Sequence, residues 1–169
     1  VWQRERLQGE ALAKLREHWQ HTLAGAVELA LPLDHPRPRV MAHEGGSCRL
    51  QLPAATVQAL RALAQEEGAT PFMVLCAAFS SLLGQWARQD EVLIGTPVNT
   101  RQRAELEPLI GFFVNMLALR FDVAGRPSLR QMTQRARQTL SAAYAHQDLP
   151  FEQLTEGLQL PRDLSRNPL

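Results

Sequence analysis

Apolar residues recur at helical spacing near the start of the chain. Between residues 6 and 23 they follow one another at steps of one, three or four, which places them on one face of a helix. They are Leu7, Ala11, Leu12, Leu15, Trp19 and Leu23. Gly25 follows, and a glycine just past the last periodic residue commonly ends a helix. The pattern predicts an amphipathic helix over residues 6–23.

The hydrophobic pattern then breaks and resumes. Residues 32–39 contain three prolines, which lack the backbone N–H that helices and sheets need, so an extended connector is predicted there. Residues 47–52 alternate polar and apolar side chains, as a strand does. Pro53 is expected to start a helix, because proline suits the first helical position. The apolar residues at helical spacing after it are Val57, Leu60, Leu63 and Ala64.

A long apolar helix is predicted next. Thr70 is a good N-cap residue, Pro71 suits the first helical position, and the following 16 residues contain few polar groups. A helix that is apolar nearly all round is expected in the centre of a core.

The last third of the chain reads as two strands and two helices. Residues 91–99 hold a continuous apolar run that glycine and proline close, which is typical of a buried strand, and residues 111–123 form a second candidate. Pro127 and Pro150 each open a helical pattern. Because helices and strands interleave without strict alternation, the fold class is a mixed α/β layered domain.

Composition excludes several partners and sites. The 169 residues are 45% hydrophobic and 21% charged, with a formal net charge of +1, so no long-range field favours nucleic acid or a membrane surface. No segment reaches the roughly 18 unbroken apolar residues of a membrane span. Cys48 and Cys76 show neither C-x-x-C nor histidine at ligand spacing, so neither a metal site nor a disulfide is predicted. Reduced thiols fit a cytoplasmic protein.

No general catalytic signature is complete, so single polar residues carry the candidate chemistry. His146 lies near Asp148 and Glu152 and could act as an oriented general base. The interpretation we favour is structural: a histidine that closes a helix suits the negative end of its dipole, and the carboxylates suit the start of the next helix.

Three further polar residues stand beside the two predicted strands. Asn115 lies in an apolar run, where an unpaired amide would cost about 1–3 kcal/mol. It is either satisfied structurally or faces a channel and orients an amide-like ligand. Asn99 and Arg101 leave the first strand at its end, where sheets commonly expose functional groups. Arg101 can equally be read as a solvated charge.

Four separated segments resemble the condensation domains of nonribosomal peptide synthetases. Their order in the chain is that of the family, and residues 34–38 and 94–98 fall where the family has similar stretches. The four segments are Val-Trp-Gln-Arg-Glu at 1–5, Ile-Gly-Phe-Phe-Val-Asn at 110–115 through Leu119-Arg120, His-Gln-Asp-Leu-Pro-Phe-Glu at 146–152, and Arg-Asp-Leu-Ser-Arg-Asn-Pro-Leu at 162–169.

The resemblance implies an architecture and a reaction. In that family two lobes like chloramphenicol acetyltransferase form a V around a tunnel. The acceptor amine on one carrier protein attacks the thioester on another, and a peptide bond forms. The family's paired-histidine motif, His-His-x-x-x-Asp-Gly, belongs to the lobe before residue 1, and His146 does not replace it. The chain is thus expected to be one tunnel wall, active as an acyltransferase only within the full synthetase.

The resemblance also implies roles for individual residues. Arg101 would pair with the aspartate of the paired-histidine motif, and Gly111, Asn115 and Asn99 would lie near the tunnel. The remaining motif residues would be structural. These are His146, Asp148, Pro150, Glu152, Arg162, Asp163 and Asn167.

The same resemblance implies the organisation and partners of the chain. Residues 1–31 would form a lobe-linking helix region, 32–45 the extended connector, and 46–169 a C-terminal lobe truncated at its end. The expected partners are the upstream lobe, donor and acceptor peptidyl carrier proteins and an adjacent adenylation domain. Phosphopantetheine would arrive on the carriers, with no cofactor bound directly.

Two alternatives remain at this point. One is an epimerisation or heterocyclisation domain of the same superfamily, and the other is a noncatalytic module that binds carrier proteins. In either case the lobe interface would be left exposed as an apolar patch in the isolated chain.

Overall fold

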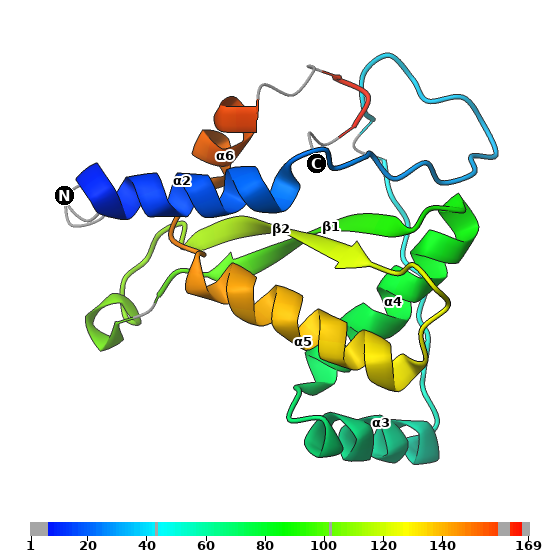
Figure 1. Ribbon diagram of the computed structural model, residues 1–169. Coiled ribbons are helices and arrows are strands. Elements are labelled where there is room, and N and C mark those ends of the chain that lie inside the picture. The colour runs from blue at the N-terminus through cyan, green and yellow to red at the C-terminus, as the bar shows by residue number, and fades with distance from the viewer. Residues whose placement is uncertain (1–6, 43, 102, 159–162, 167–169) are drawn as a thin grey trace.

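A computed structural model of the protein describes residues 7–42, 44–101, 103–158 and 163–166. Its helices and strands interleave without strict alternation, which makes the fold mixed α/β, as predicted (Figure 1). In chain order the elements are α2 (Gly9–Leu23), α3 (Ala54–Glu66), α4 (Pro71–Ala87), β1 (Glu91–Asn99), the short 3₁₀ helix η1 (Ala104–Leu106), β2 (Val114–Asp122), α5 (Leu129–Ala145) and α6 (Phe151–Leu158).

A two-stranded antiparallel sheet lies at the centre. The register of β1 and β2 runs from Glu91 opposite Asp122 to Asn99 opposite Val114. In Figure 1, α2 and α6 lie on one side of this hairpin, and α4 and α5 lie on the other. The buried side chains from all these layers form one continuous hydrophobic cluster.

The predicted first helix is confirmed, with its start three residues later than expected. α2 buries Trp19 and Leu23 against the core, and Gly25 follows with a left-handed φ of +66°. Arg120 of β2 donates from Nη1 to the carbonyl oxygens of Thr22 (3.0 Å) and Ala24 (2.8 Å). This guanidinium therefore satisfies carbonyls that the helix end leaves without partners.

The predicted strand over residues 47–52 is wrong. These residues form no strand, and all of them are exposed, with Leu50 at 83%. Alternation alone does not make a strand, because the backbone must also find a neighbouring strand, and within the described ranges none pairs with this segment. Residues 32–39, predicted to be an extended connector, contain no regular secondary structure.

The start of α4 is as predicted, but its burial is not. Thr70 Oγ1 accepts a hydrogen bond from the backbone N–H of Met73 (3.2 Å), and Pro71 is the first helical residue. Val74 and Ala77 are fully buried, whereas Phe79 and Trp86 are about half exposed or more. The prediction of a helix surrounded by core is therefore only half right, because α3, α5 and the hairpin leave part of the helix exposed.

The second half of the fold agrees closely with the sequence. β1 has the expected bounds, while β2 is shorter than the predicted 111–123 because residues 111–113 have no strand opposite them. Ser128 caps α5 by accepting from the backbone N–H of Gln131 (3.3 Å), and α6 follows Pro150.

Among the described residues, no single helix is long and apolar enough to cross a membrane. α3 and α4 would pass such a test only jointly, and the chain bends by 105° between them. One side of α4 is part of the core, where a helix of this composition is expected.

Candidate functional site at the loop end of the hairpin

The chain leaves β1 in a tight turn that positions Arg101. The backbone N–H of Thr100 donates to the Phe113 carbonyl (2.9 Å) and closes the strand pair. Asn99 Oδ1 then accepts from the backbone N–H of Arg101 (2.9 Å), a local asparagine turn that bends the chain. Asn99 is thus exposed at the strand end, as predicted, and its amide oxygen shapes the backbone of its neighbour.

The Arg101 guanidinium lies across the loop end of the hairpin, where residues 100–113 connect β1 to β2. Nη2 donates to the carbonyl oxygens of Leu109 (3.0 Å) and Gly111 (3.5 Å). The Cζ atom lies 4.1 Å from the centre of the Phe113 ring, over its face, which is a favourable cation–π position. These contacts hold the guanidinium in place, while the side chain as a whole is only partly buried.

One donor of Arg101 has no acceptor. Nε is buried, and within the described ranges it finds no hydrogen-bond partner. No carboxylate of those same ranges pairs with this guanidinium either. A buried N–H without an acceptor costs about 1–3 kcal/mol, so an acceptor is expected to approach from outside the described residues.

Gly111 makes room for this arrangement. A Cβ at position 111 would lie 3.0 Å from Cε2 of Phe113, closer than side-chain atoms pack comfortably. Any larger residue would push the ring on which Arg101 rests. The structure therefore brings Asn99, Arg101 and Gly111 together, whereas Asn115 contacts the α5–α6 junction.

Asn115 connects two of the sequence motifs. Its Nδ2 donates to the carbonyl oxygens of Gln147 and Leu149, each at 2.8 Å, and its Oδ1 accepts from the backbone N–H of Phe151 (3.1 Å). Both amide hydrogens and one oxygen lone pair are thus used to hold the α5–α6 junction against β2. A ligand-orienting role stays a prediction, and it would rest on the remaining lone pair of Oδ1.

His146 is the C-cap residue of α5. Its Nδ1 donates to the Ala142 carbonyl (2.8 Å), and its own carbonyl accepts from the indole N–H of Trp19 (3.0 Å). The imidazole also stacks on that of His18, with centroids 3.5 Å apart. Burial lowers the pKa of His18, and the nearby His146 and His21 lower it further. One ring face and one nitrogen of His146 are therefore engaged, as a structural role requires.

The other motif residues lie around the same junction or near the end of the chain. Asp148 is half-buried beside a small hollow lined by α2, the Pro150 carbonyl accepts from the N–H of Leu154 (3.1 Å), and Glu152 stands in the first turn of α6. Hydrogen bonds from Ser165 lower the pKa of Asp163. Arg162 and Asn167 lie outside the described residues.

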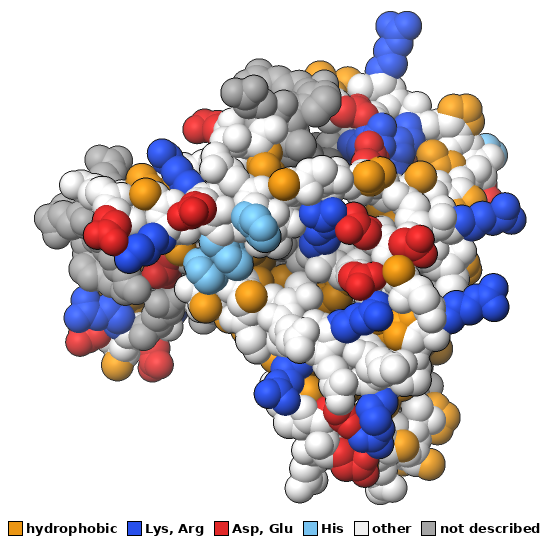
Figure 2. Space-filling model, in the orientation of Figure 1, with side chains coloured by type: hydrophobic (Ala, Val, Ile, Leu, Met, Phe, Trp, Pro, Cys, Tyr) orange, Lys and Arg blue, Asp and Glu red, His pale blue; other side chains and the backbone are white. Residues whose placement is uncertain are grey.

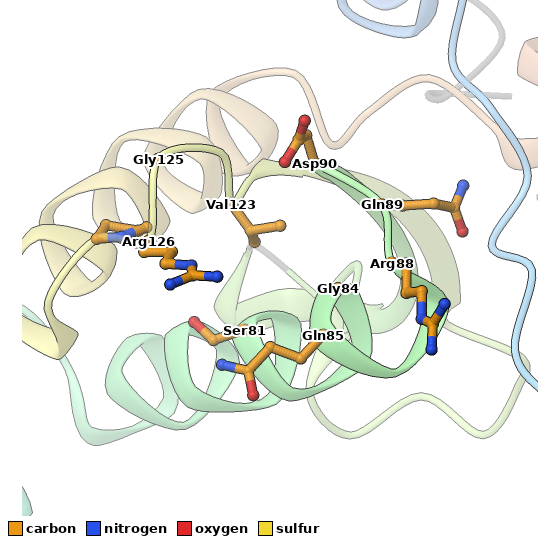
Figure 3. A pocket seen from close by; sticks show the side chains of 10 residues that line it. Ser81, Gly84, Gln85, Arg88, Gln89, Asp90, Val123, Gly125 and Arg126 are labelled. Atoms are coloured by element: carbon orange, nitrogen blue, oxygen red, sulfur yellow. The ribbon is translucent and has the colours of Figure 1, made fainter.

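A second hollow, which the sequence did not indicate, lies at the opposite end of the hairpin. Its volume is about 660 Å³, and it lies between the end of α4 and the turn that joins β2 to α5 (Figure 3). Arg88 and Arg126 line it, and both have left-handed backbones with φ of 53° and 50°. The described residues hold no group of three histidine, cysteine or carboxylate side chains that would suit a metal ion.

The face of the molecule shown in Figure 2 mixes acidic and basic side chains without a patch of one sign. This agrees with the net charge of +1. Electrostatic steering of a strongly charged macromolecule is therefore weak from this side.

Comparisons with known proteins agree with this geometry. The family model for the condensation domain matches residues 1–169. A linear gramicidin synthase of Brevibacillus parabrevis is 50% identical over the whole chain, which covers 3% of that protein. Phosphinothricin tripeptide synthetase PhsC of Streptomyces viridochromogenes is 43% identical over 99% of the chain, which covers 16% of that protein.

Solved structures show the same fold. The X-domain from teicoplanin biosynthesis superposes with a TM-score of 0.91 at 30% identity, covering 99% of this chain and 38% of that one. The four-domain nonribosomal peptide synthetase AB3403, bound to AMP and glycine, gives 0.88 at 30% identity over 94% of this chain and 12% of its own.

The fold is thus that of the chloramphenicol acetyltransferase-like domains. Within that class, the chain belongs to the condensation domain family of nonribosomal peptide synthetases. It spans only a few per cent of the first synthetases to which it is similar. The condensation domains of such synthetases are acyltransferase-type units, and the synthetases carry substrates on phosphopantetheine arms of their carrier domains.

Proposed function

We propose that this chain forms the C-terminal part of a condensation domain that makes amide bonds between carrier-bound thioesters. The acceptor's amine nitrogen attacks the donor's thioester carbonyl, a C–N bond forms, and the C–S bond breaks. The amine loses one proton and the departing pantetheine sulfur gains one, so the exchange is redox-neutral and needs no oxidant. The growing peptide then remains on the acceptor's arm.

The orphaned Nε of Arg101 supports this proposal more than any other single observation. Among the described residues this guanidinium, whose Nε is buried, meets only carbonyls and an aromatic face, and it lacks the carboxylate that arginine forks suit best. We assign that carboxylate to the aspartate of the paired-histidine motif in the other lobe. Arg101 would then be a positioning residue, because it fixes the shape of a catalytic segment without touching the reacting atoms.

The surrounding contacts fix the orientation of the Arg101 guanidinium. Two carbonyl oxygens accept hydrogen bonds from Nη2, and the Phe113 ring stacks against one face of the guanidinium. A side chain with this many contacts keeps one orientation, which a lysine at the same position would not reproduce.

The test uses a two-lobed domain that contains residues 1–169 and an intact paired-histidine motif. We expect Arg101→Gln to reduce condensation between two loaded carrier proteins by about 100-fold, measured by intact mass spectrometry, because a charge-assisted pair is lost. Replacing the motif aspartate by asparagine should give a similar loss, and the double variant should be no slower than either single variant.

Arg61→Gln is the matched control, since that arginine is exposed on α3, away from the hairpin loop. It should leave the rate within about twofold, as expected of an exposed surface charge. Independent, multiplying losses in the double variant would mean that Arg101 and the aspartate do not form a pair. Residues 1–169 without the other lobe should yield no product.

The epimerisation and heterocyclisation alternatives depend on the other lobe. An epimerisation domain normally shares the paired histidines, and a heterocyclisation domain replaces them with an aspartate-rich segment. If the intact, folded two-lobed domain forms no peptide, the epimerising alternative gains support.

A noncatalytic binding role is the second candidate. The X-domain from teicoplanin biosynthesis, with a TM-score of 0.92 and 30% identity, has been solved in complex with OxyB. A pull-down with a pantetheinylated carrier protein tests carrier binding by this chain, and no retention would count against it. We also keep the cytoplasm as the proposed location, because Cys48 and Cys76 are free thiols.

A further inference from the structure

Phe113 lies outside the hydrophobic core. Its side chain is half-buried, yet within the described residues it neither belongs to the continuous core cluster nor packs against it. Its neighbour Phe112 is 89% exposed. Core packing in this part of the chain therefore does not explain the place that the Phe113 ring takes.

The described neighbours of the ring are a cation and a glycine. The Cζ atom of Arg101 lies over the ring, 4.1 Å from its centre. A Cβ at position 111 would lie 3.0 Å from Cε2 and 3.7 Å from Cδ2 of the same ring. Because Gly111 has no Cβ, the ring can fold back over the backbone two residues before it and meet the guanidinium there.

The backbone brings the two side chains into reach. The N–H of Thr100 donates to the Phe113 carbonyl (2.9 Å), one step beyond the last strand pair, in which Asn99 lies opposite Val114. Phe113 is therefore held beside Thr100, whose next neighbour in the chain is Arg101. Backbone pairing sets the distance between the guanidinium and the ring, and the side-chain contact then sets the direction of the guanidinium.

The ring restrains the guanidinium in a way that its hydrogen bonds do not. The hydrogen bonds to the Leu109 and Gly111 carbonyls both start from Nη2, so they leave the group free to pivot about that atom. A cation over the negative face of an aromatic ring is attracted to it, and this attraction opposes the pivot. The direction of the unpaired Nε of Arg101 therefore depends on Phe113.

We propose that Phe113 is a positioning residue for condensation, whose π face holds the Arg101 guanidinium so that Nε meets its acceptor in the other lobe. This inference rests on the proposed function, in which that acceptor is the aspartate of the paired-histidine motif. Loss of a cation–π contact changes an equilibrium by roughly two- to thirtyfold. The rate should change by a factor in this range, because only a correctly directed guanidinium supports the motif.

The test replaces Phe113 by fluorinated phenylalanines in a two-lobed domain that contains residues 1–169. Fluorine withdraws electrons from the ring face at nearly constant ring size, so the 4-fluoro, 3,5-difluoro and 3,4,5-trifluoro residues weaken the attraction stepwise. We expect the logarithm of kcat to fall linearly along the series, reaching about fivefold below the parent. The KM for either loaded carrier protein should stay constant, because the ring acts through Arg101 and not on the carriers.

Matched variants separate this role from simple space filling. Phe113→Tyr keeps the π face and should leave kcat within about threefold, whereas Phe113→Leu is apolar without a π face and should lower kcat about tenfold. The same fluorine series at Phe79, half exposed on α4 and outside the hairpin loop, should leave kcat unchanged.

The fluorine series in an Arg101→Gln background completes the cycle. Fluorination of Phe113 should then have no further effect, because the cation is gone. A decline in both backgrounds would show that the ring acts on another group, and a flat series in the parent would show that only its bulk matters. Either result overturns the inference. A large loss from Arg101→Gln beside a flat series would remove the role of Phe113 alone, whereas no loss from Arg101→Gln would contradict the proposed function as well.

A spectroscopic measurement on the unsubstituted domain covers the case in which a variant fails to fold. The ring current of Phe113 should shift the guanidinium resonances of Arg101 upfield from those of the exposed Arg61 in an NMR spectrum of arginine-labelled protein. Resonances at the position of a free arginine would show that the ring does not hold the guanidinium.

Discussion

Asn115 Oδ1 accepts a hydrogen bond from the backbone N–H of Phe151, 36 residues further along the chain, over 3.1 Å. The same side chain donates twice to the segment just before Phe151. One amide on β2 therefore fixes the path of the chain between α5 and α6. Within the four sequence segments that resemble the family, this contact joins the second to the third.

Asn115→Asp should lower the free energy of unfolding by about 2–3 kcal/mol. The carboxylate keeps the acceptor for Phe151 but removes both donors, so the carbonyls of Gln147 and Leu149 lose their partners and face a negative charge. Asn99→Asp is the matched control, because Asn99 is exposed and uses only its oxygen. Chemical denaturation of both variants measures the difference, and equal losses would contradict the assigned role.

Gly84→Ala should be destabilising although alanine is the better helix former. A Cβ at position 84 would lie 2.6 Å from Val123 Cγ2 and 3.1 Å from the Gln89 carbonyl oxygen. Overpacking of this kind costs about 1–3 kcal/mol, which exceeds the gain of roughly 1 kcal/mol in helix propensity. Gly157→Ala provides the comparison, since its nearest neighbour is 4.0 Å away. Thermal unfolding should move in opposite directions for the two variants.

Arg120→Met separates helix capping from ion pairing. Arg120 donates to two carbonyls at the end of α2 and pairs with Glu91 at 2.6 Å. Loss of the charged cap should cost about 1–2 kcal/mol of unfolding free energy. Glu91→Gln removes only the ion pair, which is partly exposed, and should cost less than about 0.5 kcal/mol. If the two variants were equally destabilised, the ion pair would be the dominant contact.

The stacked histidines predict that the free energy of unfolding falls as the pH falls. The pKa of His18 lies below its ordinary value of 6.5, chiefly through burial and then through His146 and His21. The unfolded chain therefore binds a proton more readily than the folded chain. The contribution of His18 is complete above pH 6.5 and declines as the pH falls through that value.

This decline can be measured from about pH 7.5 to 5.5, above the range in which carboxylates titrate. His18→Gln should flatten the dependence of unfolding free energy on pH, whereas His35→Gln, in the exposed connector, should not. An NMR titration of the His18 ring gives the pKa directly. A value at or above 6.5 would refute the argument.

Features encoded within a few residues were predictable from sequence. The Thr70 cap, the start of α4 and the bounds of β1 all follow from local spacing and residue type. The alternation over 47–52 misled because a strand also needs a partner, and that partner is not encoded in the strand itself. The burial of α4 was overestimated for a similar reason. Composition shows that a helix is apolar, but it does not show which elements surround the helix.

The candidate site was predictable in its members but not in its contacts. Asn99, Arg101 and Gly111 were chosen by position, and the fold does bring them together. The acceptors of Asn115 are backbone carbonyls more than 30 residues away. Every residue has such a carbonyl, so no residue type in the sequence could mark them.

The hydrogen bond from Trp19 to the His146 carbonyl spans 127 positions, and this separation affects how the protein is made. At about 5–20 residues per second on the ribosome, the acceptor is synthesised roughly 6 to 25 s after the indole. During that interval the Trp19 indole of α2 lacks its native hydrogen-bond acceptor. On the ribosome, α2 therefore cannot complete its packing against the α5–α6 junction until His146 has been synthesised.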